Sequence, residues 1–82
     1  MGLADEIHEF AKRNYVDMAR RQNAGTVAIR VGDVHKAMVL QSRYAAVYAA
    51  LGADKFEAMC AVQRVGIIGP LNGAKTDFIF RL

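Results

Sequence analysis

Apolar residues recur every three or four positions in the first quarter of the chain and again in its middle, a spacing typical of amphipathic helices. This spacing predicts a first helix over residues 3–23, which Gly25 is expected to end. Two shorter helices are expected over residues 32–39 and 43–51, with Ser42 as the N-terminal cap of the second. Such a pair of helices joined by a short turn is a helix-turn-helix pattern.

Alternation and turn residues predict three strands. The run Thr26–Val31 is rich in β-branched residues and flanked by glycines, which favours a strand. Residues 62–69 and 76–82 flank Pro70–Lys75, a segment that holds a proline and an Asn-Gly pair. Because Asn-Gly tolerates the positive φ of tight turns, the two runs predict a β-hairpin.

One more short helix is expected between the paired helices and the hairpin. Asp54 and Glu57 have the spacing of a capping box, which predicts a helix over residues 55–61 with Cys60 on its inner face. The order is therefore helix, strand, helix, helix, short helix, strand, strand. This order predicts an α+β fold, and a chain of 82 residues leaves room for a single domain over residues 1–82.

Composition excludes several protein classes. An apolar fraction of 54% is too high for a disordered chain. No apolar stretch approaches the roughly 20 residues that span a bilayer, and the acidic start does not fit a secretory signal. A single cysteine, Cys60, cannot form an internal disulfide. These features predict a cytoplasmic protein with no membrane partner.

The positive charge lies in the middle of the chain. The net charge is +3, but residues 20–55 alone hold six Lys and Arg against two Asp and Glu, a sum of +4. A basic segment can attract phosphates, whereas the alternative is a solvated surface that only keeps the protein soluble. For Arg30 and Arg64, the sequence leaves open a DNA contact or a surface ion pair.

The order of elements resembles that of winged helix-turn-helix domains. The resemblance implies that the strand after the first helix joins the hairpin in a three-stranded sheet. It also implies a helix-turn-helix over about residues 32–51, whose second helix is the recognition helix, and a hairpin wing over about residues 65–82. The resemblance extends over nearly the whole chain, but it rests on the order of the elements and not on an invariant motif.

A second resemblance concerns particular residues. The stretch Ile29–Val34, continued by His35 and Lys36 and followed by Ser42-Arg43-Tyr44, resembles small uncharacterised prokaryotic winged-helix modules. Some of those modules accompany restriction-type defence proteins. This resemblance implies a prokaryotic protein that regulates transcription or assists a mobile-element or defence system.

The expected DNA contacts follow from the geometry of such domains. The N-terminal residues of a recognition helix face base edges in the major groove, where Gln suits adenine and Arg suits guanine. The preceding helix crosses the phosphate backbone, and a wing tip can touch the minor groove or flanking phosphates. His35 fits a structural role better than a ligand role. The residues expected to contact double-stranded DNA are Lys36, Gln41, Ser42, Arg43, Asn72 and Lys75.

No constellation for catalysis is apparent in the sequence. His8, expected on an exposed helix face, and His35 have no cysteine or carboxylate cluster at metal-ligand spacing. Cys60 is expected to be a core residue and not a nucleophile. We therefore expect no enzyme activity, metal or cofactor.

A protein-interaction role is the alternative to DNA binding. Ala46, Ala49 and Ala50 are expected on the outer face of the recognition helix, where a smooth surface suits a protein partner as well as DNA. The high apolar fraction is consistent with a buried partner surface. The alternative function is therefore a homodimer, or an inhibitor of a host protein, on the same fold.

Overall fold

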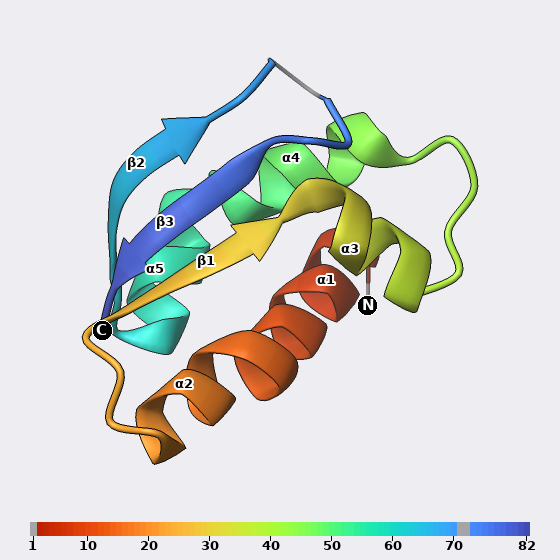
Figure 1. Cartoon of the computed structure of the whole chain (residues 1–82). Helices are drawn as coiled ribbons and strands as arrows, with labels where there is room; N and C mark the ends of the chain where they lie inside the picture. The colour runs from red at the N-terminus through yellow and green to blue at the C-terminus, as the bar shows by residue number, and fades with distance from the viewer. Residues whose placement is uncertain (1, 71–72) are drawn as a thin grey trace.

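The computed structural model describes residues 2–70 and 73–82, in which helices cover one side of a small antiparallel sheet (Figure 1). The predicted α+β mixture and the order of its elements are confirmed. Along the chain these are α1 (Leu3–Ala11), η1 (Lys12–Val16), α2 (Asp17–Arg21), β1 (Thr26–Arg30), α3 (Val31–Ala37), α4 (Tyr44–Leu51), α5 (Asp54–Cys60), β2 (Gln63–Ile68) and β3 (Asp77–Arg81).

The first helix is one continuous stretch in which η1 is a π-helical turn between α1 and α2. It ends at Arg21, two residues before the predicted end, and the left-handed residue after its cap is Asn23 and not the predicted Gly25. Asn23 takes the left-handed conformation with φ of 56°, and the N–H of Ala24 donates to the Ala19 carbonyl over 3.0 Å. This is the pattern of a Schellman motif, and Asn tolerates its left-handed position because its short polar side chain bonds locally.

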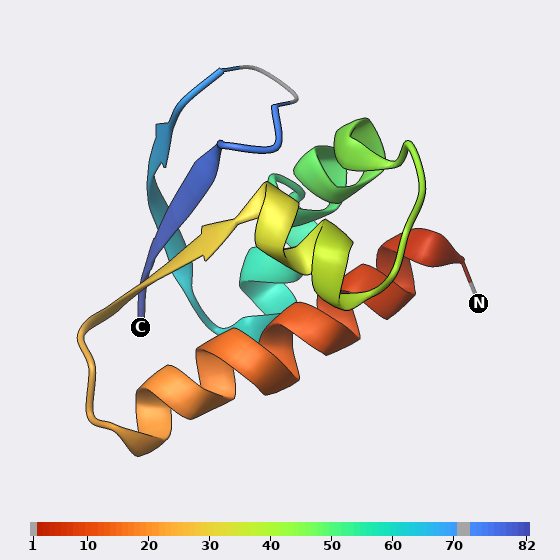
Figure 2. The ribbon, with the colours of Figure 1, turned by 45° about the vertical axis from the view of Figure 1, so that its right-hand side comes forward.

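The sheet has the order β1-β3-β2, with β3 antiparallel to both neighbours. Side chains alternate along β3, so Phe78 and Phe80 point to the helices and are fully buried. Ile29 pairs with Phe78 across the ladder and is fully buried as well. Val31, predicted to end the first strand, instead begins α3 and packs into the core. The helices leave the opposite face of the sheet uncovered (Figure 2).

The core lies between the sheet and α1, α4 and α5. Aromatic rings fill much of it: Tyr48 meets Phe78 at a centroid distance of 5.1 Å, and Phe56 meets Phe80 at 5.3 Å. None of the helices in the described part of the chain is long and apolar enough to cross a membrane. The buried apolar residues are Ile7, Ala11, Val16, Ala19, Ile29, Val31, Val34, Val47, Ala50, Leu51, Phe56, Cys60, Val62, Phe78 and Phe80.

The start of α5 differs from the predicted capping box. Ala53 is the N-cap, and Asp54 already lies inside the helix without a side-chain cap. The Glu57 carboxylate accepts a hydrogen bond from the Arg64 N–H over 3.0 Å and lies 3.7 Å from its guanidinium. Glu57 therefore links α5 to β2 instead of closing its own helix.

Candidate nucleic-acid interface

The paired helices α3 and α4 are joined by a connection with two left-handed residues. Val39 and Ser42 have φ of 56° and 52°, a conformation that L-residues rarely adopt. The N–H of Leu40 donates to the His35 carbonyl over 3.1 Å, so α3 ends in a second Schellman-type turn. Local hydrogen bonds thus define the end of α3.

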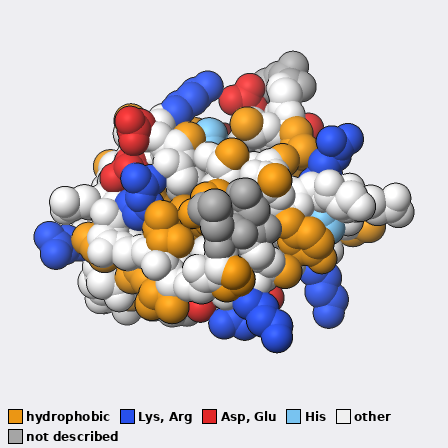
Figure 3. Space-filling model, turned by 90° about the horizontal axis from the view of Figure 1, so that it is seen from above, with side chains coloured by type: hydrophobic (Ala, Val, Ile, Leu, Met, Phe, Trp, Pro, Cys, Tyr) orange, Lys and Arg blue, Asp and Glu red, His pale blue; other side chains and the backbone are white. Residues whose placement is uncertain are grey.

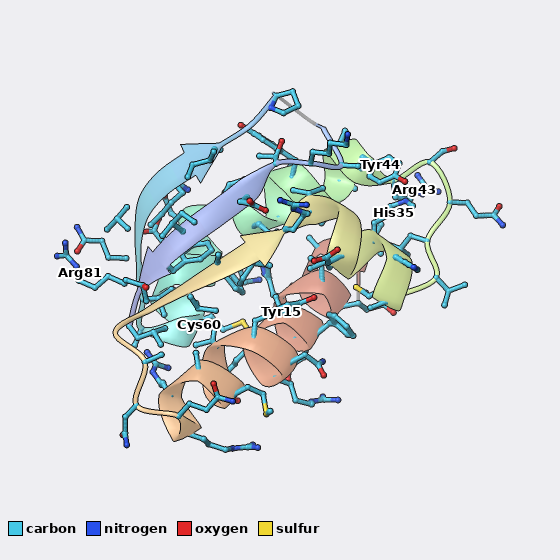
Figure 4. The ribbon with its side chains drawn as sticks, in the orientation of Figure 1. Tyr15, His35, Arg43, Tyr44, Cys60 and Arg81 are labelled. Atoms are coloured by element: carbon cyan, nitrogen blue, oxygen red, sulfur yellow. The ribbon has the colours of Figure 1, made fainter. Side chains whose placement is uncertain are left out.

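His35 attaches the start of α4 to α3. Its side chain is buried, its Nε2 accepts the Arg43 N–H over 3.1 Å, and its ring stacks on Tyr44 at a centroid distance of 3.9 Å. The bond requires a lone pair on Nε2, so the proton of this neutral ring is on Nδ1. Figure 4 shows these three side chains together at one end of the molecule. The predicted structural role of His35 is confirmed.

Ser42 does not cap α4, which corrects the sequence-based prediction. Arg43 is the N-cap and no side chain bonds the helix start as an Ncap would. With φ of 52°, Ser42 lacks the extended backbone that an Ncap residue normally has. The His35 ring bonds the N–H of the N-cap residue instead.

The hairpin is docked on the start of α3. The Gly32 N–H donates to the Ala74 carbonyl over 2.8 Å, and the Val31 N–H donates to the Thr76 carbonyl over 2.9 Å. These two bonds flank Lys75. Figures 1 and 2 both show this end of the hairpin beside the first turn of α4. The structure therefore brings the hairpin and the paired helices to one end of the molecule.

The predicted DNA contacts all come from this end, where the structure describes them. Lys36 is exposed on α3, Arg43 is exposed at the start of α4, and Lys75 is exposed in the hairpin. Gln41 and Ser42 are exposed in the α3–α4 connection. Asn72 lies outside the described residues. In the view from above, Lys and Arg side chains are spread around the margin and do not form one block (Figure 3).

Most Lys and Arg side chains elsewhere in the described residues are paired with carboxylates, but those at this end are not. Among the described residues, Lys36, Arg43 and Lys75 take part in no ion pair. Arg30, whose role the sequence left open, lies 2.8 Å from Asp77, and the hydrogen bond lowers the pKa of that carboxyl and raises the pKa of the guanidinium. Cations paired with carboxylates are Lys12, Arg13, Arg30, Lys55 and Arg64.

The exposed alanine face of α4 is smaller than expected. Ala45 and Ala49 are exposed and Ala46 is half-buried, but Ala50 is only 3% exposed and belongs to the core. Its predicted exposure is wrong because α1 packs against this side of α4. Tyr44 remains 39% exposed at the helix start.

The structure places the cysteine and histidine residues that the sequence analysis considered for chemistry. No group of three or more His, Cys, Asp or Glu could hold a metal there. Cys60 is 1% exposed, and burial raises the pKa of its thiol, which disfavours the thiolate that a nucleophile needs. His8, predicted to be exposed, is 2% exposed and its Nε2 donates to the Ala50 carbonyl over 2.8 Å.

A pocket along α1 was not expected from the sequence. It has a volume of about 570 Å³ and is lined by both apolar side chains and carboxylates. Two of the carboxylates, those of Asp5 and Glu9, are already paired with Lys55 and Arg13. Its lining residues are Asp5, Glu6, Glu9, Phe10, Arg13, Met38 and Met59.

The chain matches no protein family, no curated protein and no solved structure.

Proposed function

We propose that this protein binds double-stranded DNA through α3, α4 and the β2–β3 hairpin, as a winged helix-turn-helix domain. The element order and the sheet support this fold, since β1 follows the first helix and pairs with β3 of the hairpin. The docking of the hairpin on Gly32 also supports it, because a wing contributes to binding only if it has a defined position beside the paired helices.

The observation that carries the proposal is the group of cations without carboxylate partners at this end. Among the described residues, Lys36, Arg43 and Lys75 come from three different segments and none is in an ion pair. A side chain that is already paired with a carboxylate gains less from a phosphate, because that attraction must first be given up. The unpaired cations of this end therefore have more to gain from a phosphate than the cations that are already paired with carboxylates.

The proposed contacts divide into two kinds. Arg43 and Gln41 precede the first turn of α4, where side chains reach base edges if that helix enters the major groove. Lys36 and Lys75 would meet phosphates on either side. Because the exposed residues of α4 beyond Tyr44 include alanines, few of its side chains can read bases. We therefore expect binding that depends mainly on phosphates and is modest in sequence specificity.

A salt titration of binding to a duplex tests the proposal. The slope of log K against log salt concentration should lose about 0.9 for each phosphate contact removed, so the pair Lys36→Gln and Lys75→Gln should flatten it. Arg21→Gln is the matched control, because Arg21 is also exposed and takes part in no ion pair among the described residues. No binding at low salt, or a double variant that binds like the parent, would overturn the proposal.

A protein-interaction role is the second candidate, and one observation favours it. Val39 is 84% exposed in the α3–α4 connection, and Tyr44, the first residue of α4, is 39% exposed. Apolar side chains at this position suit a protein partner better than a phosphate backbone. Binding that ignores salt would favour this role, whereas a steep salt dependence would favour DNA. If the protein binds DNA, its resemblance to small prokaryotic winged-helix modules implies a regulatory or defence-associated role.

A further inference from the structure

Strand β2 carries an unusual amount of exposed apolar surface. Among the described residues, half of the exposed large hydrophobic side chains lie on it: Val65, Ile67 and Ile68 are 45%, 44% and 62% exposed. β2 is also an edge strand, with β3 as its one neighbour in the sheet. Figure 1 shows it along the outer margin of the sheet. An apolar edge with unpaired backbone groups is a template for another strand.

The register identifies which backbone groups of β2 face outward. Leu82 donates to the Gly25 carbonyl, so even-numbered residues of β3 face β1 and odd-numbered ones face β2. Ile79 and Asp77 pair with Gly66 and Ile68, which therefore face β3. The N–H and carbonyl of Ile67 consequently point away from the sheet.

The edge of β2 lacks the free charged side chains that commonly keep another strand from pairing with an edge strand. Arg64 is the one charged residue of β2, and its guanidinium is occupied by Glu57 and the Gly52 carbonyl. A bulge between Arg64 and Gly66 interrupts the start of the strand but leaves residues 66–68 regularly paired with β3. The edge of β1 differs, because its exposed residues include Arg30 and no large hydrophobic side chain.

We propose that β2 pairs antiparallel with β2 of a second copy of this chain, about a two-fold axis at Ile67. In this register the two Ile67 residues exchange their N–H and carbonyl groups as a hydrogen-bonded pair. Their side chains meet on one face of the extended sheet. On the other face, each Ile68 lies directly opposite Gly66 of the other copy.

Self-complementarity of shape is the reason to assign a second copy as the occupant. A Cβ added at Gly66 would make only ordinary contacts with side-chain carbons of Ile79, at 3.8 and 3.9 Å, so its own copy leaves room beside this glycine. The protruding Ile68 of the second copy fills that room. Residues 66–68 are uncharged and face each other across the two-fold axis without like charges, although each whole chain carries +3.

Sedimentation of the full chain, together with hydrogen exchange, tests the proposal without any DNA. From roughly 10 µM to roughly 1 mM, we expect a reversible shift from monomer to dimer. Over the same range, exchange of the Ile67 amide should become slower. A chain that stays monomeric, forms larger aggregates, or dimerises with an unchanged Ile67 exchange rate would overturn the proposal.

Matched variants test whether the dimer forms through β2 or through another surface. Ile68→Lys and Gly66→Ala should each weaken the dimer by about tenfold or more, because the first adds a charge to the edge and the second fills the space that Ile68 needs. Met18→Lys makes the same kind of change at an exposed apolar residue of α2 and should leave the dimer intact. Thermal unfolding checks that each variant is folded. Equal dimerisation of Ile68→Lys and the parent would contradict the inference.

Discussion

The interior beneath the sheet and the end formed by α3, α4 and the hairpin are held in different ways. In the interior, Phe78 and Phe80 are fully buried and touch several other rings, so many weak contacts act together. At the other end, the candidate DNA contacts are exposed, and their segments are held by a few hydrogen bonds such as those of His35 and Gly32. Apolar packing thus stabilises the fold, whereas single polar contacts position the candidate interface.

The largest difference in the free energy of unfolding should be seen when one side chain is shortened to alanine in each region. Phe78→Ala leaves a cavity beside Tyr48 and Phe80 and should lower the free energy of unfolding by about 3–5 kcal/mol. Lys75→Ala, in the hairpin, should change it by less than about 0.5 kcal/mol. Urea denaturation measures both. Similar losses for the two variants would mean that the two regions do not differ as described.

A smaller effect should follow from separating the hairpin from α3. A Cβ on Gly32 would lie 2.6 Å from the Ala74 carbonyl oxygen, closer than the atoms tolerate. Gly32→Ala should therefore lower the free energy of unfolding by about 1–3 kcal/mol. Gly25→Ala is the matched control, because a Cβ there meets nothing within 4 Å and should be neutral or slightly stabilising. A tolerated Gly32→Ala would contradict the close approach of the hairpin.

The His35 contact divides into a hydrogen bond and a ring stack, which two variants separate. His35→Phe keeps an aromatic ring against Tyr44 but removes the acceptor for the Arg43 N–H, a loss of about 1 kcal/mol. His35→Ala also removes the stack, worth roughly another 0.5–1.5 kcal/mol. Chemical denaturation gives the stabilities. If the two variants are equally stable, the ring stack makes no contribution to this end.

The smallest effect concerns the ion pair of Arg30 and Asp77. Folding lowers the pKa of Asp77, so the pair adds stability above the ordinary carboxyl value of 3.8 and loses it as pH falls through the lowered value. Because the pair is on the surface and screened by solvent, we expect the smallest effect of these variants. Melting temperatures of the parent and of Asp77→Asn should therefore differ at neutral pH and converge in acid. A difference that grows in acid would reverse the assigned sign.

Patterns that depend on near neighbours were predictable from the sequence. Helical spacing of apolar residues predicted the first helix to within two residues of Arg21, and alternation in the last seven residues predicted the inward Phe78 and Phe80. The positions of the exposed cations Lys36, Arg43 and Lys75 on the paired helices and in the hairpin were also predictable, because each follows from its element. Whether these cations bind phosphates remains a prediction.

Predictions about hydrogen-bond partners were less successful. Ser42 and Asp54 have side chains that suit helix caps, yet neither caps its helix. In each case the observed bond joins two different elements: the His35 ring accepts the N–H of Arg43, and the Glu57 carboxylate accepts the N–H of Arg64. The helix propensities of neighbouring residues cannot predict these bonds, because donor and acceptor come together only when the elements pack.

The sequence by itself determined the class of fold, the order of its elements and the basic middle of the chain, because periodicity and charge are properties of the chain alone. Only the tertiary structure decided which cations are neutralised by carboxylates, that His8 is buried, and that β2 is an apolar edge of the sheet. The physical reason is that pairing and burial depend on contacts between residues far apart in the sequence. A local pattern contains no record of those contacts.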